Sequence, residues 1–94
     1  SEYGGHTIRH GDILGLKNGK LEYIEKDPVA ACVRVTRSFA TKHTSFITLI
    51  YGEGITQEQA EEAKRTLENK LHSDVEITLV DGGQPVYYFI ISVE

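Results

Sequence analysis

The stretch FITLIYGEGITQEQAEEAKRTLENKLHSDVEITLV, residues 46–80, decides the fold of this chain. Residues 46–51 form an unbroken apolar run rich in β-branched and aromatic side chains, which predicts a strand covered on both faces. Residues 75–79 alternate between apolar and polar side chains, which predicts a strand over residues 75–80 with one exposed face or at a sheet edge. A helical pattern runs between them, over residues 56–72. This order predicts a β-α-β crossover with parallel strands.

Two patterns support the helix over residues 56–72. Thr56 stands three residues before Gln59, which is the spacing of a capping box in which each residue hydrogen-bonds the backbone of the other. The apolar side chains that follow recur at helical spacing and indicate one buried face: Ala60, Ala63, Leu67 and Leu71.

The segment before this unit predicts a β-hairpin. Residues 13–16 and 21–24 read as short strands, and they flank Lys17-Asn18-Gly19-Lys20. Asn-Gly favours the two positive φ angles of a type I′ turn, which joins neighbouring antiparallel strands. Residues 6–9 are expected to pair beside this hairpin, with residues 10–12 as the connecting turn.

A second helix is predicted between the hairpin and the apolar strand. Asp27 is a good N-cap residue, and Pro28 fits the first helical position. The helix is expected to continue to about residue 40 and to pack on the sheet through one side: Val29, Cys32, Val33, Thr36 and Phe39.

We therefore expect an α/β fold, with α+β as the alternative. The chain is predicted to form a single compact domain over residues 1–94, with a mixed β-sheet, an N-terminal β-hairpin, two helices and one β-α-β crossover. The last strand is expected over residues 86–93. Gly82-Gly83 favours a hairpin between this strand and strand 75–80, and a longer crossing is the alternative.

Composition excludes several classes of partner. The formal net charge is −4, from 14 acidic and 10 basic residues, and the basic residues are scattered among the acids. A nucleic-acid partner is therefore not expected. No apolar run approaches the roughly 18 residues that span a bilayer, so membrane insertion is not expected either. The single cysteine and the lack of a signal-peptide pattern predict a cytoplasmic protein. The absence of Met suggests a piece of a longer chain.

The residues that could carry chemistry are dispersed. The four histidines and Cys32 show no ligand spacing, so we expect surface histidines, a core cysteine and no metal site. No nucleophile motif is present, and no catalytic residue is assigned. Five acids fall at predicted loop ends, where solvated turn formers are expected and an acid/base pair is the alternative: Asp12, Glu53, Asp74, Asp81 and Glu94.

Two loops are the candidate sites. Gly52-Glu53-Gly54 lies between a strand and a helix N-terminus, where a tight turn is favoured over an anion site because Glu53 brings negative charge. In the closing run, Gly82-Gly83 predicts a turn and Pro85 removes a backbone donor. Tyr87 and Tyr88 follow. The residues alone leave open whether this run is a strand buried on both faces or an aromatic contact patch.

The sequence resembles a known bacterial family. The segments that carry the resemblance are residues 46–53, Thr56 with the acidic helix, residues 83–87 and residues 90–94, with the hairpin region 11–20 agreeing as well. Over nearly its whole length the chain resembles the C-terminus of the dihydroxyacetone-kinase-like proteins, the ATP-binding subunit of fatty acid kinase. This region of the family is related to DegV-type acyl-binding proteins.

The resemblance implies a docking role without chemistry. It implies ATP and Mg²⁺ in an N-terminal domain outside these residues, no cofactor here, and contacts with an acyl-binding DegV-type protein and the rest of the kinase chain. The contacts are expected at the two loops: Gly52, Glu53, Gly54, Asp81, Gly82, Gly83, Gln84, Pro85, Tyr87 and Tyr88. A small-molecule-sensing regulatory module and a minimal enzyme that uses loop carboxylates are the alternatives.

Overall fold

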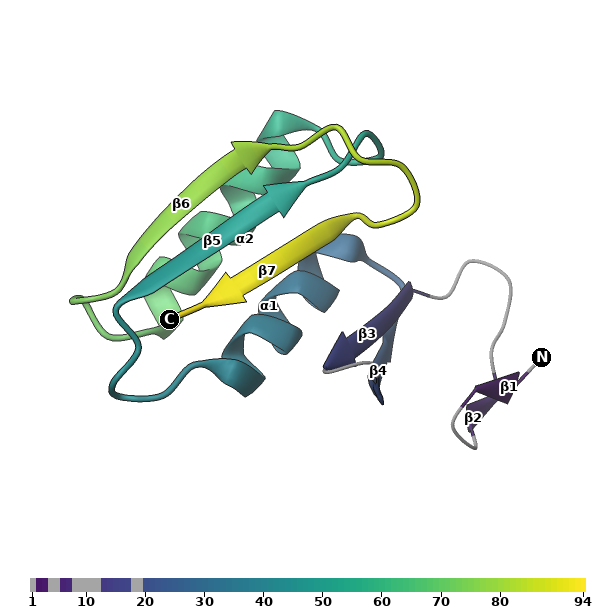
Figure 1. Cartoon of the computed structure of the whole chain (residues 1–94), viewed down its shortest axis with the longest axis horizontal. Helices are drawn as coiled ribbons and strands as arrows, with labels where there is room; N and C mark the ends of the chain where they lie inside the picture. The colour runs from purple at the N-terminus through teal and green to yellow at the C-terminus, as the bar shows by residue number, and fades with distance from the viewer. Residues whose placement is uncertain (1, 4–5, 8–12, 18–19) are drawn as a thin grey trace.

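Two helices cover one face of a three-stranded sheet in the computed structural model of this chain (Figure 1). The structure describes residues 2–3, 6–7, 13–17 and 20–94, with side chains from Glu25 onward. The elements follow in this order: β1 Glu2–Tyr3, β2 His6–Thr7, β3 Ile13–Lys17, β4 Lys20–Glu25, α1 Pro28–Phe39, β5 Phe46–Tyr51, α2 Gln57–Lys70, β6 Glu76–Asp81 and β7 Phe89–Val93. The expected α/β domain with a mixed sheet and two helices is confirmed.

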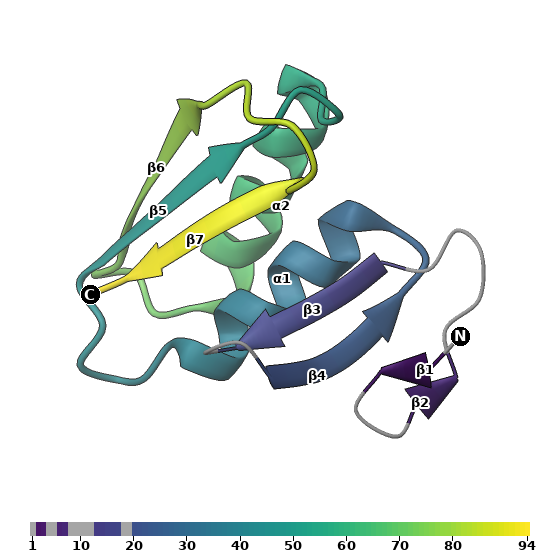
Figure 2. The same ribbon diagram turned by 45° about the vertical axis from the view of Figure 1, so that its right-hand side comes forward.

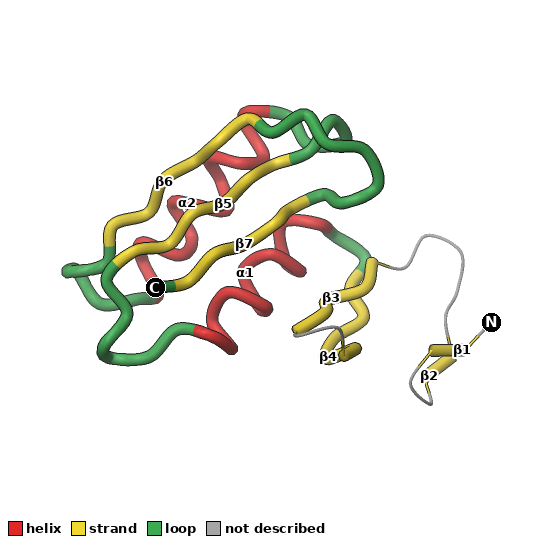
Figure 3. Tube along the Cα trace, in the orientation of Figure 1, coloured by secondary structure: helices red, strands yellow, loops and turns green. Residues whose placement is uncertain are grey.

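The β-α-β crossover is also confirmed. β5 and β6 are parallel and in register from Phe46 opposite Glu76 to Tyr51 opposite Asp81, and α2 connects them. β7 pairs antiparallel with the other side of β5, so the sheet order is β6-β5-β7 (Figure 3). The hairpin that Gly82-Gly83 favoured is therefore wrong, because the chain takes the longer crossing past the end of β5.

Local signals place both helices as predicted. At α2, the Gln59 N–H donates to Thr56 Oγ1 at 3.1 Å, and the Thr56 N–H donates to Gln59 Oε1 at 2.9 Å. This is the complete capping box. At α1, the Asp27 carboxylate accepts from the Val29 N–H at 3.3 Å, and Pro28 occupies the first turn, where its missing N–H costs nothing.

The core lies between the helices and the inner face of the sheet. α1, β5, α2 and β6 supply its buried side chains: Val29, Cys32, Val33, Ile47, Leu49, Ala63, Leu67 and Ile77. β7 adds half-buried side chains at Phe89, Ile91 and Val93. Apart from Phe39, which is only half-buried, the side of α1 expected to pack is buried.

The expectation that residues 46–51 are covered on both faces is wrong. Ile47 and Leu49 are 1% and 0% exposed, whereas Phe46 on the opposite face is 54% exposed. Figures 1 and 2 show the reason, since both helices lie on the same side of the sheet. We call the other side, which carries Phe46, Thr48 and Ile50 of β5, the open face.

The hairpin of β3 and β4 is confirmed, and it packs against α1 (Figure 2). Its Asn18-Gly19 turn lies outside the described residues. The pairing of residues 6–9 beside this hairpin is wrong for the described part, because β2 pairs with β1 in a separate two-stranded sheet. The connecting turn at residues 10–12 also lies outside the described residues. Neither α1 nor α2 is long and apolar enough to cross a membrane.

Candidate docking surface

The topology brings the two predicted loops together. β5 and β6 are parallel, so their carboxyl ends lie at the same edge of the sheet, and β7 starts there because it runs antiparallel. Tyr51, the last residue of β5, has Asp81 on one side and Phe89 on the other. We call residues 52–54 and 81–88 together the loop-end surface.

Backbone hydrogen bonds join the two loops. The Gly52 N–H donates to the Tyr88 carbonyl at 2.8 Å, and the Glu53 N–H donates to the Gln84 carbonyl at 3.0 Å. The N–H groups of Gly82 and Gly83 both donate to the Tyr51 carbonyl, at 2.9 and 3.2 Å. Because the Gly52 and Glu53 amides are already paired, they are not free to hold an anion. The tight turn expected for Gly52-Glu53-Gly54 is the better interpretation.

The side chain of Gln84 adds a second set of links. Its Nε2 donates to the Ile50 carbonyl at 3.1 Å and to the Tyr87 carbonyl at 3.3 Å. One amide thus connects the end of β5 with the segment that leads into β7. The sequence placed Gln84 among the candidate residues but gave no sign of this bracing role, because the partners are carbonyl groups brought near only by the fold.

Glycine is required where the loops meet. A Cβ atom at Gly52 would lie 2.3 Å from the Tyr87 carbonyl oxygen and 2.6 Å from that of Gln84, distances at which the backbone must shift. At Gly54 a Cβ atom would meet the Tyr88 ring at 3.0 Å. Gly52 therefore serves the close approach of the closing segment to the end of β5, whereas at Gly54 a small shift of the exposed Tyr88 ring would make room.

The closing segment is a loop up to Tyr88, and the strand expected from residue 86 begins only at Phe89. Gly83 and Val86 have positive φ angles of 63° and 74°. The Tyr87 N–H donates to the Pro85 carbonyl at 2.8 Å, which closes a γ-turn around Val86. This kind of turn is rare and strained, and a β-branched residue at its centre is exceptional.

The γ-turn holds large apolar side chains in solvent. Val86 is 88% exposed, Tyr87 60% and Tyr88 42%. The buried-strand interpretation of this run is therefore wrong, and the aromatic residues are accessible for contact. The two tyrosines precede β7 in the loop, and only Phe89 lies in the strand.

The open face continues this apolar surface. Ile50, Val80 and Ile90 lie side by side on the three strands, in the register row next to the loop-end surface. Val80 and Ile90 are exposed and Ile50 is half-buried. Sequence reasoning missed Val86 and these three residues as site candidates. The period of two in β6 and β7 could have placed Val80 and Ile90 away from the core.

The acids expected at loop ends do not form one group. Glu53 and Asp81 both belong to the loop-end surface and are exposed. Asp74 precedes β6, and Glu94 pairs with Phe46 at the start of β5, so both lie at the opposite end of the sheet. Asp12 lies outside the described residues. Within the described residues, no group of three or more potential ligands could hold a metal ion.

Cys32 is a core residue, as expected. It is buried in α1 against the sheet. Burial raises the pKa of its thiol from the ordinary 9.0 to about 12, and the Thr36 hydroxyl offsets this only in part. A thiol with this pKa remains protonated at neutral pH and is a poor nucleophile.

Comparison with known proteins finds one family across the whole chain. Residues 1–94 match the FakA-like C-terminal family, which is the C-terminal domain of the A-type subunit of fatty acid kinase and its relatives. The protein YloV of Bacillus subtilis is 29% identical over 90 residues, and a Staphylococcus haemolyticus protein is 27% identical over 90 residues. Each match covers 96% of this chain but only 16% of the relative. The chain therefore corresponds to a small part of these longer proteins.

Proposed function

The chain belongs to the FakA-like C-terminal family of fatty acid kinase proteins, and on this premise we propose that it is a non-catalytic docking domain for the acyl-binding partner of the kinase. The partner is a DegV-type protein that presents the fatty acid. ATP and Mg²⁺ are held elsewhere in the longer protein, which phosphorylates the fatty acid carboxylate. The function of this domain is to bring the acyl carrier near the ATP-binding domain.

The main support for the proposal is the loop of Tyr87 and Tyr88, which is exposed and is held in place by hydrogen bonds. Tyr87 and Tyr88 stand in solvent on a segment that Gln84, Gly52 and Glu53 fix to the end of β5. A contact residue that is already fixed loses little conformational freedom on binding, which favours affinity. Tyrosine also supplies a large apolar area with a polar hydroxyl, as interfaces commonly require.

The open face supplies an adjoining apolar area. Ile50, Val80 and Ile90 form a row beside the loop-end surface, where a partner that covers the tyrosines can also reach them. Apolar area of this kind contributes roughly 25 cal/mol for each Å² removed from water. Glu53 and Asp81 at the rim favour a partner with basic residues around an apolar centre.

Docking raises the rate of a two-protein reaction without adding a catalytic group. A domain joined to the ATP-binding part by a covalent chain holds the acyl carrier at an effective concentration that can reach the millimolar range. The substrate carboxylate then meets the phosphoryl donor within one assembly. Because the proposed role needs no acid or base here, it is consistent with loop carboxylates that lie at opposite ends of the sheet.

Substitution of the two tyrosines tests the proposal. The double variant Tyr87→Ala/Tyr88→Ala is expected to bind the fatty-acid-loaded partner at least about tenfold more weakly in isothermal titration calorimetry, because central aromatic side chains dominate interface energy. Phe46→Ala is the matched control, since Phe46 is an exposed aromatic residue at the far end of the open face. Unchanged affinity in a double variant with an intact circular dichroism spectrum would contradict the docking role.

The alternatives predict different results with the isolated chain. A sensing module predicts a rise in melting temperature when a fatty acid or a nucleotide is added. A minimal enzyme predicts turnover by the chain alone that is lost in Glu53→Gln. A docking domain predicts stabilisation by the partner protein only.

A further inference from the structure

β6 has a free edge. It pairs with β5 on one side, and no described strand pairs with its other side. The Glu76 N–H donates to the carbonyl of Ser45, just before β5, and the Gly82 N–H donates to the carbonyl of Tyr51, at the end of β5. Because alternate residues of a strand direct their backbone groups to opposite sides, Ile77, Leu79 and Asp81 present their N–H and C=O groups at the free edge.

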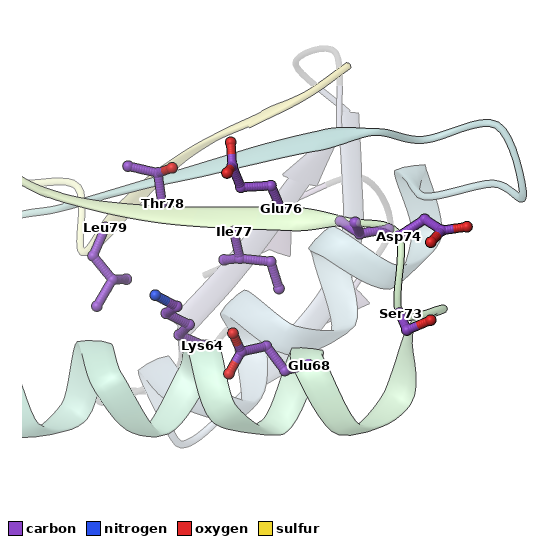
Figure 4. A pocket seen from close by; sticks show the side chains of 9 residues that line it. Lys64, Glu68, Ser73, Asp74, Glu76, Ile77, Thr78 and Leu79 are labelled. Carbon is purple, nitrogen blue, oxygen red and sulfur yellow. The ribbon is translucent and has the colours of Figure 1, made fainter.

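A groove of about 680 Å³ runs along this edge, between β6 and α2. Figure 4 shows Ile77 and Leu79 pointing from the strand toward the helix, and Lys64 and Glu68 extending from the helix toward the strand. The side chains of Glu76 and Thr78 lie on the other side of the strand. Unpaired backbone groups therefore lie beside the buried Ile77 and the half-buried Leu79, in a groove whose exposed lining is mostly polar.

This arrangement suits one kind of occupant, an added strand. An extended peptide satisfies free donors and acceptors along a sheet edge and places alternate side chains on its two sides. Here one set of side chains would enter the groove over Ile77 and Leu79, and the other would lie beside Glu76 and Thr78. A globular surface without an extended segment would leave these backbone groups to water or to scattered side chains.

The charges of the groove indicate the composition of that strand. Among its described lining residues, Glu68, Asp74 and Glu76 are accompanied by a single basic residue, Lys64. Acids at a sheet edge oppose pairing with a second copy, because like charges then accumulate along the shared edge. The same carboxylates attract an extended segment that carries Lys or Arg.

We propose that the free edge of β6 binds an extended basic segment of a partner polypeptide by strand addition. The groove-lining residues share no member with the loop-end surface, so this site does not depend on the proposed docking of the acyl carrier. The partner strand extends the sheet to four strands and is held by backbone hydrogen bonds to Ile77 and Leu79. Its basic side chains face Glu68 and Glu76.

Two capped heptapeptides test the inference: Lys-Thr-Val-Lys-Val-Thr-Lys and its counterpart with Glu in place of each Lys. The basic peptide is expected to shift the amide signals of Ile77 and Leu79 in ¹⁵N NMR spectra and to slow their hydrogen exchange by about fivefold or more at saturation. The acidic peptide is expected to do neither. Equal effects of both peptides, or shifts without slowed exchange, would overturn strand addition by a basic segment.

Two further measurements separate pairing from simple charge attraction. The basic peptide with all of its internal amides N-methylated keeps its charge but can donate hydrogen bonds from neither edge, so its effect on Ile77 and Leu79 exchange should disappear. Glu68→Lys should weaken binding of the unmodified basic peptide by about fivefold. Glu62→Lys, the same charge change at an exposed α2 position outside the groove, should weaken it less than about twofold. Equal losses of affinity in the two variants, or an undiminished effect of the methylated peptide on amide exchange, would reject the site.

Discussion

The two faces of the three-stranded sheet use the same strands but have different surroundings. On the inner face, Ile47, Leu49 and Ile77 are buried under α1 and α2. On the open face, Phe46, Val80 and Ile90 remain exposed. The inner face is sufficient to form a core, so the apolar residues of the open face are available for contact with another protein. This contrast teaches that apolar content does not by itself indicate burial within the chain.

The largest expected effect on stability comes from comparing substitutions at two neighbouring residues of β5. Leu49→Ala should lower the free energy of unfolding by about 2–5 kcal/mol, because it opens a cavity at a side chain that is 0% exposed. Thr48→Ala, one residue away on the open face, should change it by less than about 0.5 kcal/mol. Urea denaturation measures both values. Similar losses in the two variants would mean that the faces do not differ as described.

The pH dependence of stability tests how completely water is excluded from Cys32 on the inner face. Burial raises the Cys32 pKa from 9.0 to about 12, so above pH 9 the unfolded chain loses the thiol proton before the folded chain does. Stability should therefore be unaffected by this thiol below pH 9 and fall by up to about 1.4 kcal/mol per pH unit between pH 9 and 12.

The matched control for this measurement is Cys32→Ala, which removes the thiol and leaves every other side chain in place. Subtracting its pH profile from that of the natural chain isolates the thiol. Identical slopes above pH 9 would show that Cys32 is accessible to water.

A smaller effect is expected where the open face meets the loop-end surface. Gln84→Ala removes the donor to the Ile50 and Tyr87 carbonyls and should cost about 1 kcal/mol. It should also speed hydrogen exchange at the Glu53 amide, which donates to the Gln84 carbonyl. Gln57→Ala, at an exposed helical position, is the control and should leave that exchange rate unchanged. If the two variants behave alike, the Gln84 side chain does not hold the loop.

Sequence patterns predicted the parts of the fold that depend on near neighbours. The capping box of Thr56 and Gln59, the Asp27 cap and the period of α2 are local, and each appears as expected. The position of β7 beside β5 was not predictable in this way, because it depends on pairing between residues about forty apart. The prediction that residues 46–51 are covered on both faces was wrong for a related reason. An apolar run shows that a strand can be buried, but not how many layers the chain provides.

The candidate site was predicted in location but not in form. The two loops meet because parallel strands end at the same edge, which the β-α-β pattern implied. The γ-turn at Val86 was not predictable, since β-branched residues avoid positive φ angles. The exposure of Tyr87 and Tyr88 follows from that turn. The assignment of these residues to partner binding remains a prediction.

The sheet order β6-β5-β7 also has a consequence for folding during synthesis. β5 is the central strand, yet its antiparallel partner is made about forty residues later, after α2 and β6. Until residues 89–93 leave the ribosome, one edge of this apolar strand has no pairing partner among the described strands. Such an interval favours misassociation between nascent chains, so slower elongation or reduced chaperone supply should lower the yield of soluble domain.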